Sequence, residues 1–337
     1  MPVKARISAV EYFLPEQTLT NEDISAQFPE WSVEKIAGKT GINVRHIAAV
    51  DEFSSDLAVG AARKLFEARD IDPTSIDYLI LVTQSPDYYL PTTATIVHDQ
   101  LQLRTDAGAT DVSLGCSGYI YALGLAKGLI ESDQVGTVLV LTADTYTKFL
   151  NPADKSVRTI FGDGASATLV TSDGKRDSLG AFRYGTDGSG GKHLIVPAGG
   201  LRPASEFAPK SDPDRRGLTP GSYDLYMDGA EIFTFTIRVA QPSVTAILEK
   251  AGLGMDDVDL FVFHQANKYM LEHLRTKLGI PAEKFPILMA NYGNTVSSTI
   301  PMALADAERA GMLRPGMRVL LLGFGVGLSW GGAVVTW

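Results

Sequence analysis

Residues 65–82 are LFEARDIDPTSIDYLILV, and residues 247–263 are ILEKAGLGMDDVDLFVF. Each stretch has the pattern of a helix end, a short loop, one aspartate and then an apolar strand. The two aspartates, Asp77 and Asp259, are 182 residues apart. Both strands are continuous apolar runs, which is typical of strands that are buried on both faces of a parallel sheet. The two stretches therefore predict that one helix–strand unit occurs twice in the chain.

A second pair of segments repeats with nearly the same offset. Residues 122–141 and 301–322 each contain a helix rich in Ala and Leu, then a glycine, then the strand VLVL or VLLL. The first residues of these strands, Val138 and Val319, are 181 residues apart. The agreement favours an internal duplication, and chance similarity between helix–strand units is the alternative. Helices that alternate with buried strands predict an α/β fold with a mainly parallel sheet covered by helices.

The polar stretch near residue 178 is the expected boundary between the halves, 1–177 and 178–337. Segment 197–222 has five prolines and no apolar periodicity. It predicts a long surface loop, either a flap over a binding site or a solvated insertion. The longest uncharged apolar stretch, 319–335, is interrupted by glycines. It predicts two buried strands joined by a turn, because a membrane helix normally needs about 20 apolar residues.

The composition excludes several classes of protein. The chain has 337 residues, of which 45% are hydrophobic, so we expect a sizeable core. The single cysteine, Cys116, excludes an internal disulfide and a multi-cysteine metal site, and the five histidines lack metal-ligand spacing. We expect no metal. A net charge of −9 argues against a general nucleic-acid binder. The N-terminus lacks the apolar core of a signal peptide, so we expect a cytoplasmic protein with no membrane association.

Cys116 lies in the segment DVSLGCSGYIYALGLAKGLI, where a short apolar strand is followed by a predicted helix. A thiol at a helix N-terminus faces the positive end of the helix macrodipole, which lowers its pKa and favours a nucleophilic thiolate. A buried structural cysteine is the other interpretation of this segment.

Two further polar residues occur where α/β folds place functional groups. His264 follows the apolar strand LFVF and begins the segment HQANKYM. A position just past the carboxyl end of a buried strand is typical of a binding or catalytic site. Asn294 lies in a glycine-containing turn before a predicted helix. A histidine bonded to the backbone of its turn and an asparagine that caps a helix are the alternative interpretations.

The order of these motifs resembles the thiolase-superfamily condensing enzymes of the ketoacyl-acyl-carrier-protein synthase III type. The motifs in question are Cys116, HQAN (264–267), GNT (293–295) and GFGVGLSWG (323–331). The resemblance extends over nearly the whole chain, through YFLPEQTLTNEDI (12–24), EWSVEKIAGKTGINVRHIAA (30–49) and FGDGASATLV (161–170). It implies a thiolase-like fold, in which duplicated α/β halves form a five-layered α-β-α-β-α arrangement. This agrees with the repeat found above.

The resemblance also implies a decarboxylative Claisen condensation that gives a 3-oxoacyl product, in fatty-acid initiation or in a specialised fatty-acid or polyketide-like pathway. Cys116 would carry the acyl group, and the backbone N–H groups of Cys116 and Val326 would form the oxyanion hole. His264 and Asn294 would stabilise the malonyl-derived enolate as hydrogen-bond donors. Related enzymes use a second histidine, a second catalytic cysteine or a glutamate. Here Asn294 takes the second position, and a second cysteine is absent from the sequence.

The substrates that the resemblance implies are an acyl-CoA and a malonyl thioester on coenzyme A or acyl carrier protein, with no permanently bound cofactor. Five residues correspond to family positions that contact coenzyme A or pantetheine: Trp31, Lys39, Thr40, Lys155 and Asn267. Lysine replaces a family arginine at two of these positions. Tyr269 stands where another arginine is common.

The implied partners are an acidic carrier protein and a second copy of the chain. A carrier needs a basic surface, and Lys268, Arg275 and Lys277 are candidates for it, although a solvated helix face explains the same charges. Leu90 corresponds to the residue that a partner subunit contributes to the end of the acyl channel in the family. Because an aromatic residue is common there, the leucine predicts a longer channel for medium-chain or β-ketoacyl donors.

Two other functions stay open. The first is an acyltransferase that moves the acyl group from Cys116 to an amine or a hydroxyl, which release of CO2 from a malonyl donor would distinguish. The second is a non-catalytic partner subunit, such as the chain-length factors of polyketide systems. Those proteins lack the active cysteine, so Cys116 argues against it.

Overall fold

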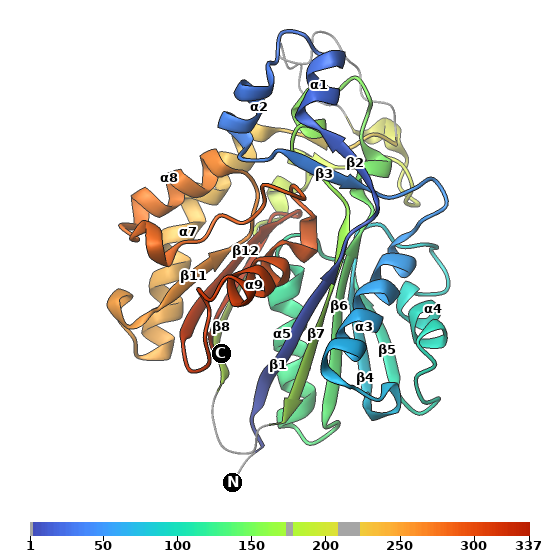
Figure 1. Cartoon of the computed structure of the whole chain (residues 1–337), viewed down its shortest axis with the longest axis vertical. Helices are drawn as coiled ribbons and strands as arrows, with labels where there is room; N and C mark the ends of the chain where they lie inside the picture. Colours follow the sequence, from blue (N-terminus) through green and yellow to red (C-terminus); the bar gives the residue numbers. More distant parts are fainter. Residues whose placement is uncertain (1–2, 173–177, 208–222) are drawn as a thin grey trace.

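The structure is a computed structural model that describes residues 3–172, 178–207 and 223–337. Its strands form two main sheets (Figure 1). The first sheet has the order β1 (Ala5–Phe13), β7 (Gly164–Ser172), β6 (Thr137–Asp144), β4 (Tyr78–Val82) and β5 (Gly108–Val112). The second has the order β11 (Leu260–Phe263), β12 (Arg318–Gly325), β13 (Ser329–Thr336) and β8 (Leu179–Thr186).

The same strand pairing occurs in both sheets. β4 is parallel to β6, which is followed by the antiparallel strands β7 and β1. In the same way, β11 is parallel to β12, which is followed by the antiparallel strands β13 and β8. β5 extends the first sheet beyond β4. Tyr78 pairs with Val138, and Leu260 pairs with Val319. The repeated pairing confirms the duplication that the sequence offsets predict.

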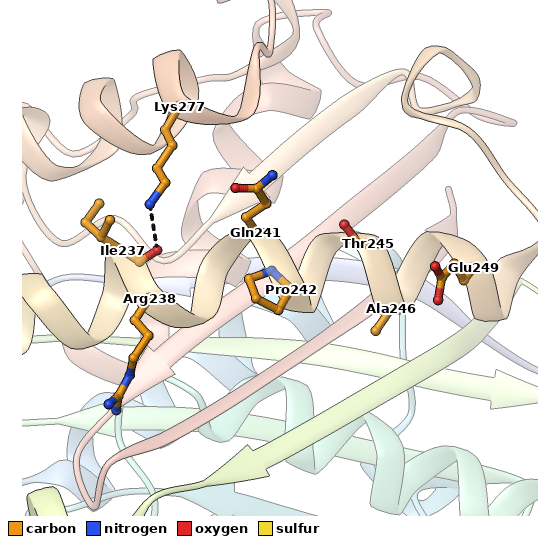
Figure 2. A pocket seen from close by; sticks show the side chains of 8 residues that line it. All are labelled: Ile237, Arg238, Gln241, Pro242, Thr245, Ala246, Glu249 and Lys277. Carbon is orange, nitrogen blue, oxygen red and sulfur yellow. Dashed lines mark hydrogen bonds between the residues drawn. The ribbon is translucent and has the colours of Figure 1, made fainter.

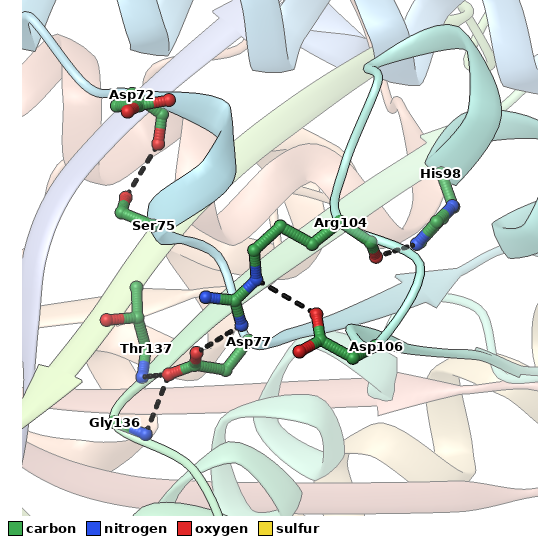
Figure 3. Close-up of polar contacts among 8 residues, drawn as sticks. All are labelled: Asp72, Ser75, Asp77, His98, Arg104, Asp106, Gly136 and Thr137. Atoms are coloured by element: carbon green, nitrogen blue, oxygen red, sulfur yellow. Dashed lines mark hydrogen bonds and ion pairs between the residues drawn. The ribbon is translucent and has the colours of Figure 1, made fainter.

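The two repeated aspartates have the same structural role. Asp77 Oδ2 accepts hydrogen bonds of 2.9 Å from the backbone N–H groups of Gly136 and Thr137, where β6 begins (Figure 3). Asp259 Oδ2 accepts a hydrogen bond of 2.8 Å from the backbone N–H of Arg318, where β12 begins. Each carboxylate therefore fixes the register between its own strand and the parallel neighbour.

Helices form the outer and the middle layers of the molecule (Figure 1). One pair contacts both sheets and lies between them, and the other two pairs cover the outer faces. The helical layers are α3 (Ser54–Arg69) with α4 (Thr93–Gln100), α5 (Gly118–Glu131) with α9 (Thr299–Arg309), and α7 (Gly229–Ala251) with α8 (Lys268–Leu278). With the two sheets between them, these layers give the expected five-layered α-β-α-β-α arrangement.

Side chains of the central strands alternate between a hydrophobic core in the middle helical layer and a second core beneath the outer helices of their own sheet. In β4, Ile80 and Val82 face the helices between the sheets, whereas Leu79 and Leu81 face the outer helices. Strands β6, β11 and β12 show the same alternation. Both faces are thus apolar, which explains the continuous apolar runs in the sequence. Each fully buried aliphatic side chain contributes about 1.5–3 kcal/mol to the stability of this arrangement.

Smaller elements gather at one end of the two sheets, in the upper part of Figure 1. β2 and β3 form an antiparallel pair. The elements are β2 (Gln17–Thr20), α1 (Asn21–Gln27), α2 (Val33–Thr40), β3 (Val44–Ile47), α6 (Lys155–Arg158), β9 (Leu194–Ile195) and β10 (Tyr226–Met227).

Three segments singled out in the sequence can be placed against this fold. Residues 319–335 form most of β12 and β13 and the turn between them, as predicted. The expected flap is described only at 197–207, where Ala204–Glu206 form a 3₁₀ turn. The rest of the flap, 208–222, and residues 173–177 beside the expected boundary lie outside the described residues. The boundary between the halves therefore stays a prediction. Within the described residues, none of the helices combines the length and apolar character needed to cross a bilayer.

Candidate active site

Cys116 lies in the connection between β5 and α5, immediately before Ser117, the N-cap of the helix. Its side chain is buried among apolar residues. A Cβ atom added to Gly323 of β12 would lie 2.8 Å from the carbonyl oxygen of Cys116 and 3.0 Å from Cα of Ser117. Only glycine allows this close approach. The C-terminal half of the chain therefore packs directly behind the candidate nucleophile.

Burial controls the ionisation of Cys116. Desolvation and, to a smaller extent, the nearby Asp144 carboxylate raise the pKa of the thiol well above its usual range. The sequence predicted a lowered pKa from the helix N-terminus. That prediction is wrong, because removal of the thiolate from water outweighs the helix macrodipole in this enclosed site. Cys116 is therefore a neutral thiol at rest.

Two serines connect the nucleophile to the turn that contains Val326. Ser117 Oγ lies 2.7 Å from Ser329 Oγ, and Ser329 Oγ donates a hydrogen bond of 2.9 Å to the carbonyl oxygen of Val326. The Val326 side chain also packs against the apolar cluster that includes Cys116. The fold thus brings the two predicted oxyanion-hole residues, Cys116 and Val326, into neighbouring turns.

His264 directly follows β11, as the sequence predicted. Its backbone N–H donates to the carbonyl oxygen of Leu322 in β12 at 2.9 Å, and its Nδ1 lies 2.6 Å from Thr299 Oγ1. Burial lowers the pKa of the His264 imidazole to about 3. The ring is therefore neutral at physiological pH, which is the state that the donor role requires.

Asn294 is held by a tight turn against the N-terminal half. Its backbone N–H donates to the carbonyl oxygen of Ile160 at 2.9 Å. The preceding Gly293 has φ of 79°, and a Cβ atom there would lie 2.9 Å from that same oxygen, so the turn requires glycine. Asn294 Oδ1 accepts a hydrogen bond of 3.0 Å from the backbone N–H of Val296. The amide N–H₂ group is thus what Asn294 offers to the cavity that it lines.

A cavity of about 990 Å³ brings the predicted site residues together. Cys116, His264 and Asn294 are buried and form one end of it, while exposed lysines line the other end. All the residues predicted to contact coenzyme A or pantetheine line the same cavity: Trp31, Lys39, Thr40, Lys155 and Asn267. The volume suits an extended small-molecule ligand that enters from solvent.

Comparison with known proteins identifies the family. Residues 110–188 match the model for 3-oxoacyl-[acyl-carrier-protein] synthase III, and residues 248–337 match the model for its C-terminal region. The chain is 36% identical to a beta-ketoacyl-[acyl-carrier-protein] synthase III of Caldanaerobacter subterraneus, over 99% of this chain and 98% of that protein. The chain belongs to the 3-oxoacyl-[acyl-carrier-protein] synthase III family. A crystal structure of a 3-oxoacyl-(acyl-carrier-protein) synthase III is 48% identical, with a TM-score of 0.94, over 99% of this chain and 100% of that chain. The Thermus thermophilus beta-ketoacyl-[acyl-carrier-protein] synthase III structure is 37% identical, with a TM-score of 0.87, over 98% and 99% of the two chains.

Lysines surround Trp31 at the exposed end of the cavity. The Nζ atoms of Lys35, Lys39 and Lys155 lie 5.0, 5.1 and 5.8 Å from the centre of the Trp31 ring. Lys155 also forms an ion pair of 3.0 Å with Glu30. Lys39 and Lys155 stand at sequence positions where the resemblance to the synthase III family implies arginines, and Lys35 adds a positive charge that the sequence did not suggest.

Two of the predicted pantetheine contacts also have roles in ending or starting helices. The Thr40 hydroxyl donates to the carbonyl oxygen of Ile36 at 2.7 Å and accepts from the backbone N–H of Ile42 at 3.1 Å, where α2 ends. Asn267 Oδ1 accepts from the backbone N–H of Met270 at 2.9 Å and caps α8. This leaves the amide N–H₂ of Asn267 for a ligand.

The structure does not bring the three predicted carrier-docking residues together. Lys268 and Arg275 line a shallow cavity of about 550 Å³, where Arg275 forms an ion pair of 2.8 Å with Glu272. Lys277 lines a different cavity, where its Nζ donates to the carbonyl oxygen of Ile237 in α7 at 3.3 Å (Figure 2). The reason is the periodicity of the α-helix, because Lys268 and Lys277 are nine residues apart and therefore point in different directions around α8. Carrier docking at α8 stays a prediction.

Leu90 lies away from the reacting groups. Its side chain is 86% exposed, next to the exposed Tyr88 and Tyr89. Among the described residues that line the cavity with Cys116, Leu90 is not found. A single chain therefore places it on the surface, and a role at the end of an acyl channel requires a second subunit.

Sequence reasoning missed three residues beside the site: Lys35, Asp144 and Thr299. Asp144 is fully buried at the end of β6 and accepts hydrogen bonds from the backbone N–H groups of Gln84 and Ser297. The rule that drew attention to His264, a polar residue at the carboxyl end of a buried strand, applies equally to Asp144. Thr299 had no such signal, because its contact with His264 depends on the tertiary structure.

Proposed function

We propose that this chain joins an acyl thioester to a malonyl-type thioester with loss of CO₂, giving a 3-oxoacyl thioester at the start of a fatty-acid or polyketide-like chain. The observation that carries the proposal is that one cavity is lined by a buried thiol, a neutral buried imidazole and a side-chain amide. Membership of the synthase III family supports it. The test is to incubate the protein with acyl-CoA and a malonyl thioester, and to measure CO₂ and the 3-oxoacyl product by mass spectrometry.

The first step is acyl transfer to Cys116. The sulfur attacks the thioester carbonyl, and the thiol proton passes to the departing thiol, so that no net proton is lost. The backbone N–H groups of Cys116 and Val326 stabilise the negative oxygen in the tetrahedral intermediate. Because the pKa of the Cys116 thiol is raised, the thiolate forms only as the attack proceeds.

The second step forms the carbon–carbon bond. The malonyl carboxylate leaves as CO₂, and its bonding electrons form an enolate whose negative charge lies on the thioester oxygen. His264 Nε2–H and the Asn294 amide donate hydrogen bonds to this oxygen. The enolate carbon then attacks the acyl carbonyl on Cys116, and the released sulfur takes up one proton. No general base is needed, which agrees with a histidine whose pKa is lowered.

The rate of malonyl decarboxylation should stay constant between about pH 5 and pH 6.5. As the pH falls from 6.5 to 5, an ordinary histidine with a pKa near 6.5 loses most of its neutral form. Burial lowers the pKa of His264 to about 3, so the ring becomes protonated only in more acidic solution. The neutral hydrogen-bond donor therefore persists throughout this range. Burial raises the pKa of Asp144 to about 7, so that carboxyl is largely protonated throughout the range. Initial rates of CO₂ release are the measurement. A rate that falls with an apparent pKa near 6.5 would contradict the neutral-donor role.

The exposed end of the cavity is our proposed site for the nucleotide phosphates of coenzyme A. Lys35 and Lys39 are four residues apart on one face of α2, and Lys155 approaches from α6. Phosphate groups carry concentrated negative charge, which ammonium groups bind without the planar geometry of arginine. The pantetheine arm then runs past Asn267 toward Cys116.

Lys39→Glu should raise the KM for acyl-CoA about tenfold, equivalent to 1.4 kcal/mol of binding free energy. The reversed charge would repel the phosphates and would also pair with the remaining lysines. The matching N-acetylcysteamine thioester has no nucleotide, so its KM should not change. Lys64→Glu, on α3 and not among the described residues that line the cavity, is the matched control. An equal rise in KM for both thioesters would place the effect elsewhere than at the phosphates.

We further propose a cytoplasmic homodimer in which Tyr88, Tyr89 and Leu90 meet the partner subunit. Their exposure supports the proposal, because three neighbouring exposed apolar side chains favour an interface. Light scattering of the purified protein tests the dimer. If Leu90 lies at the end of the acyl channel, the acyl adducts of Cys116 should include medium chains, which intact mass spectrometry against a series of donors would show.

A further inference from the structure

The backbone of one residue, Val296, contacts both Asn294 and Thr299, the hydroxyl neighbour of His264. Its N–H donates to Asn294 Oδ1 at 3.0 Å, and its carbonyl oxygen lies 3.2 Å from Thr299 Oγ1. Val296 has φ of 56°, in the left-handed region that a β-branched residue rarely adopts. Such conformations persist only where surrounding contacts enforce them, and they concentrate at functional sites.

The Thr299 hydroxyl lies between two acceptors and has one proton. Its oxygen is 2.6 Å from His264 Nδ1 and 3.2 Å from the carbonyl oxygen of Val296. Hydrogen bonds donated by a hydroxyl are typically 2.5–3.0 Å long, whereas those donated by N–H are typically about 2.7–3.2 Å. The contact of 2.6 Å therefore fits Thr299 as the donor and Nδ1 as the acceptor. A neutral imidazole that accepts at Nδ1 carries its proton on Nε2.

We propose that Thr299 is a positioning residue that holds His264 in the Nε2–H tautomer. The tautomer matters because a bare Nε2 would present a lone pair to the enolate oxygen and repel it. Thr299 is fully buried, and it is the first residue of α9, so its hydroxyl has little freedom to leave Nδ1. The catalytic consequence rests on the proposed function, whereas the tautomer itself does not.

Thr299→Val tests the proposal because valine keeps the shape of threonine and removes the hydroxyl. We expect acylation of Cys116 to continue and malonyl decarboxylation to fall about 10- to 100-fold, the usual effect of losing the partner that orients a functional histidine. Thr299→Ser keeps the hydroxyl and should restore most of the rate. A rate in Thr299→Val equal to that of the unaltered protein would overturn the proposal.

Nitrogen-15 NMR of histidine-labelled protein gives a readout that a merely structural role would not change. The chain has five histidines, and His264→Ala identifies the signal of His264. The unaltered protein should show protonated Nε2 and unprotonated Nδ1, and Thr299→Val should lose this uniform state. A protonated Nδ1 in the unaltered protein would overturn the proposal, even if Thr299→Val fails to fold. The NMR spectra can show protonated Nε2 in the unaltered protein and its loss in Thr299→Val while the protein releases no CO₂ from malonyl thioesters. That combination would support the positioning role of Thr299 and refute the proposed function.

Discussion

Cys116→Ala should abolish acyl transfer from acyl-CoA to the protein. Cys116 is the only cysteine in the sequence, so the variant has no thiol that could form a thioester. Overall condensation should fall by at least about 10⁴-fold, as expected when the nucleophile of a covalent mechanism is removed. The measurement is intact mass spectrometry after incubation with acyl-CoA, where the unaltered protein gains one acyl group and the variant gains none.

The same variant also carries an internal control. His264 and Asn294 remain in place, so malonyl decarboxylation without condensation should continue in Cys116→Ala. Retained CO₂ release shows that the cavity is still folded and separates loss of the nucleophile from loss of structure. An acyl adduct on some other residue of the variant would overturn the assignment of Cys116. An acyl-enzyme that transfers its group to an amine or hydroxyl, with no CO₂ released, would favour the acyltransferase alternative.

The α/β class and the duplication could be predicted because their determinants are local in the sequence, whereas the five-layered arrangement was implied by the resemblance to the synthase III family. Asp77 and Asp259 precede strands whose side chains are apolar on both faces, and both features are visible without any tertiary information. The position of His264 followed from the same pattern, since it directly succeeds one of those strands. The resemblance to the synthase III family then supplied the roles of Cys116 and Asn294, which the residues alone left open.

The properties that could not be predicted depend on side chains that are distant in sequence. The pKa of Cys116 is set by burial among residues such as Tyr146 and Phe161, and local sequence shows only the helix that would lower it. The backbone oxygen that Lys277 contacts, that of Ile237 in α7, is 40 residues earlier in the chain (Figure 2). The hydroxyl that orients His264 comes from Thr299, 35 residues away. Charge and spacing in a linear sequence carry no record of these contacts.

His264→Ala and Asn294→Ala should each preserve acylation of Cys116 and lower malonyl decarboxylation by about 10²- to 10³-fold. This is the usual effect of removing one hydrogen-bond donor from a site that stabilises a negative oxygen, about 2.7–4 kcal/mol in the barrier. The acyl adduct is measured by intact mass, and CO₂ release from a labelled malonyl thioester is measured separately. Loss of acylation in either variant would contradict the proposal that Cys116 carries out acylation and that His264 and Asn294 act only in decarboxylation.

Asn294→Asp is the most specific test of the two residues proposed to act in decarboxylation, His264 and Asn294. One carboxylate oxygen can still accept the hydrogen bond of 3.0 Å from the Val296 N–H, so the turn should keep its geometry. The other oxygen replaces a donor with a negatively charged acceptor, and we expect decarboxylation at least as slow as in Asn294→Ala.

Because both donors act on one enolate oxygen, the effects of His264→Ala and Asn294→Ala should combine to less than their product in the double variant. Fully multiplicative effects would instead indicate that the two side chains stabilise different groups.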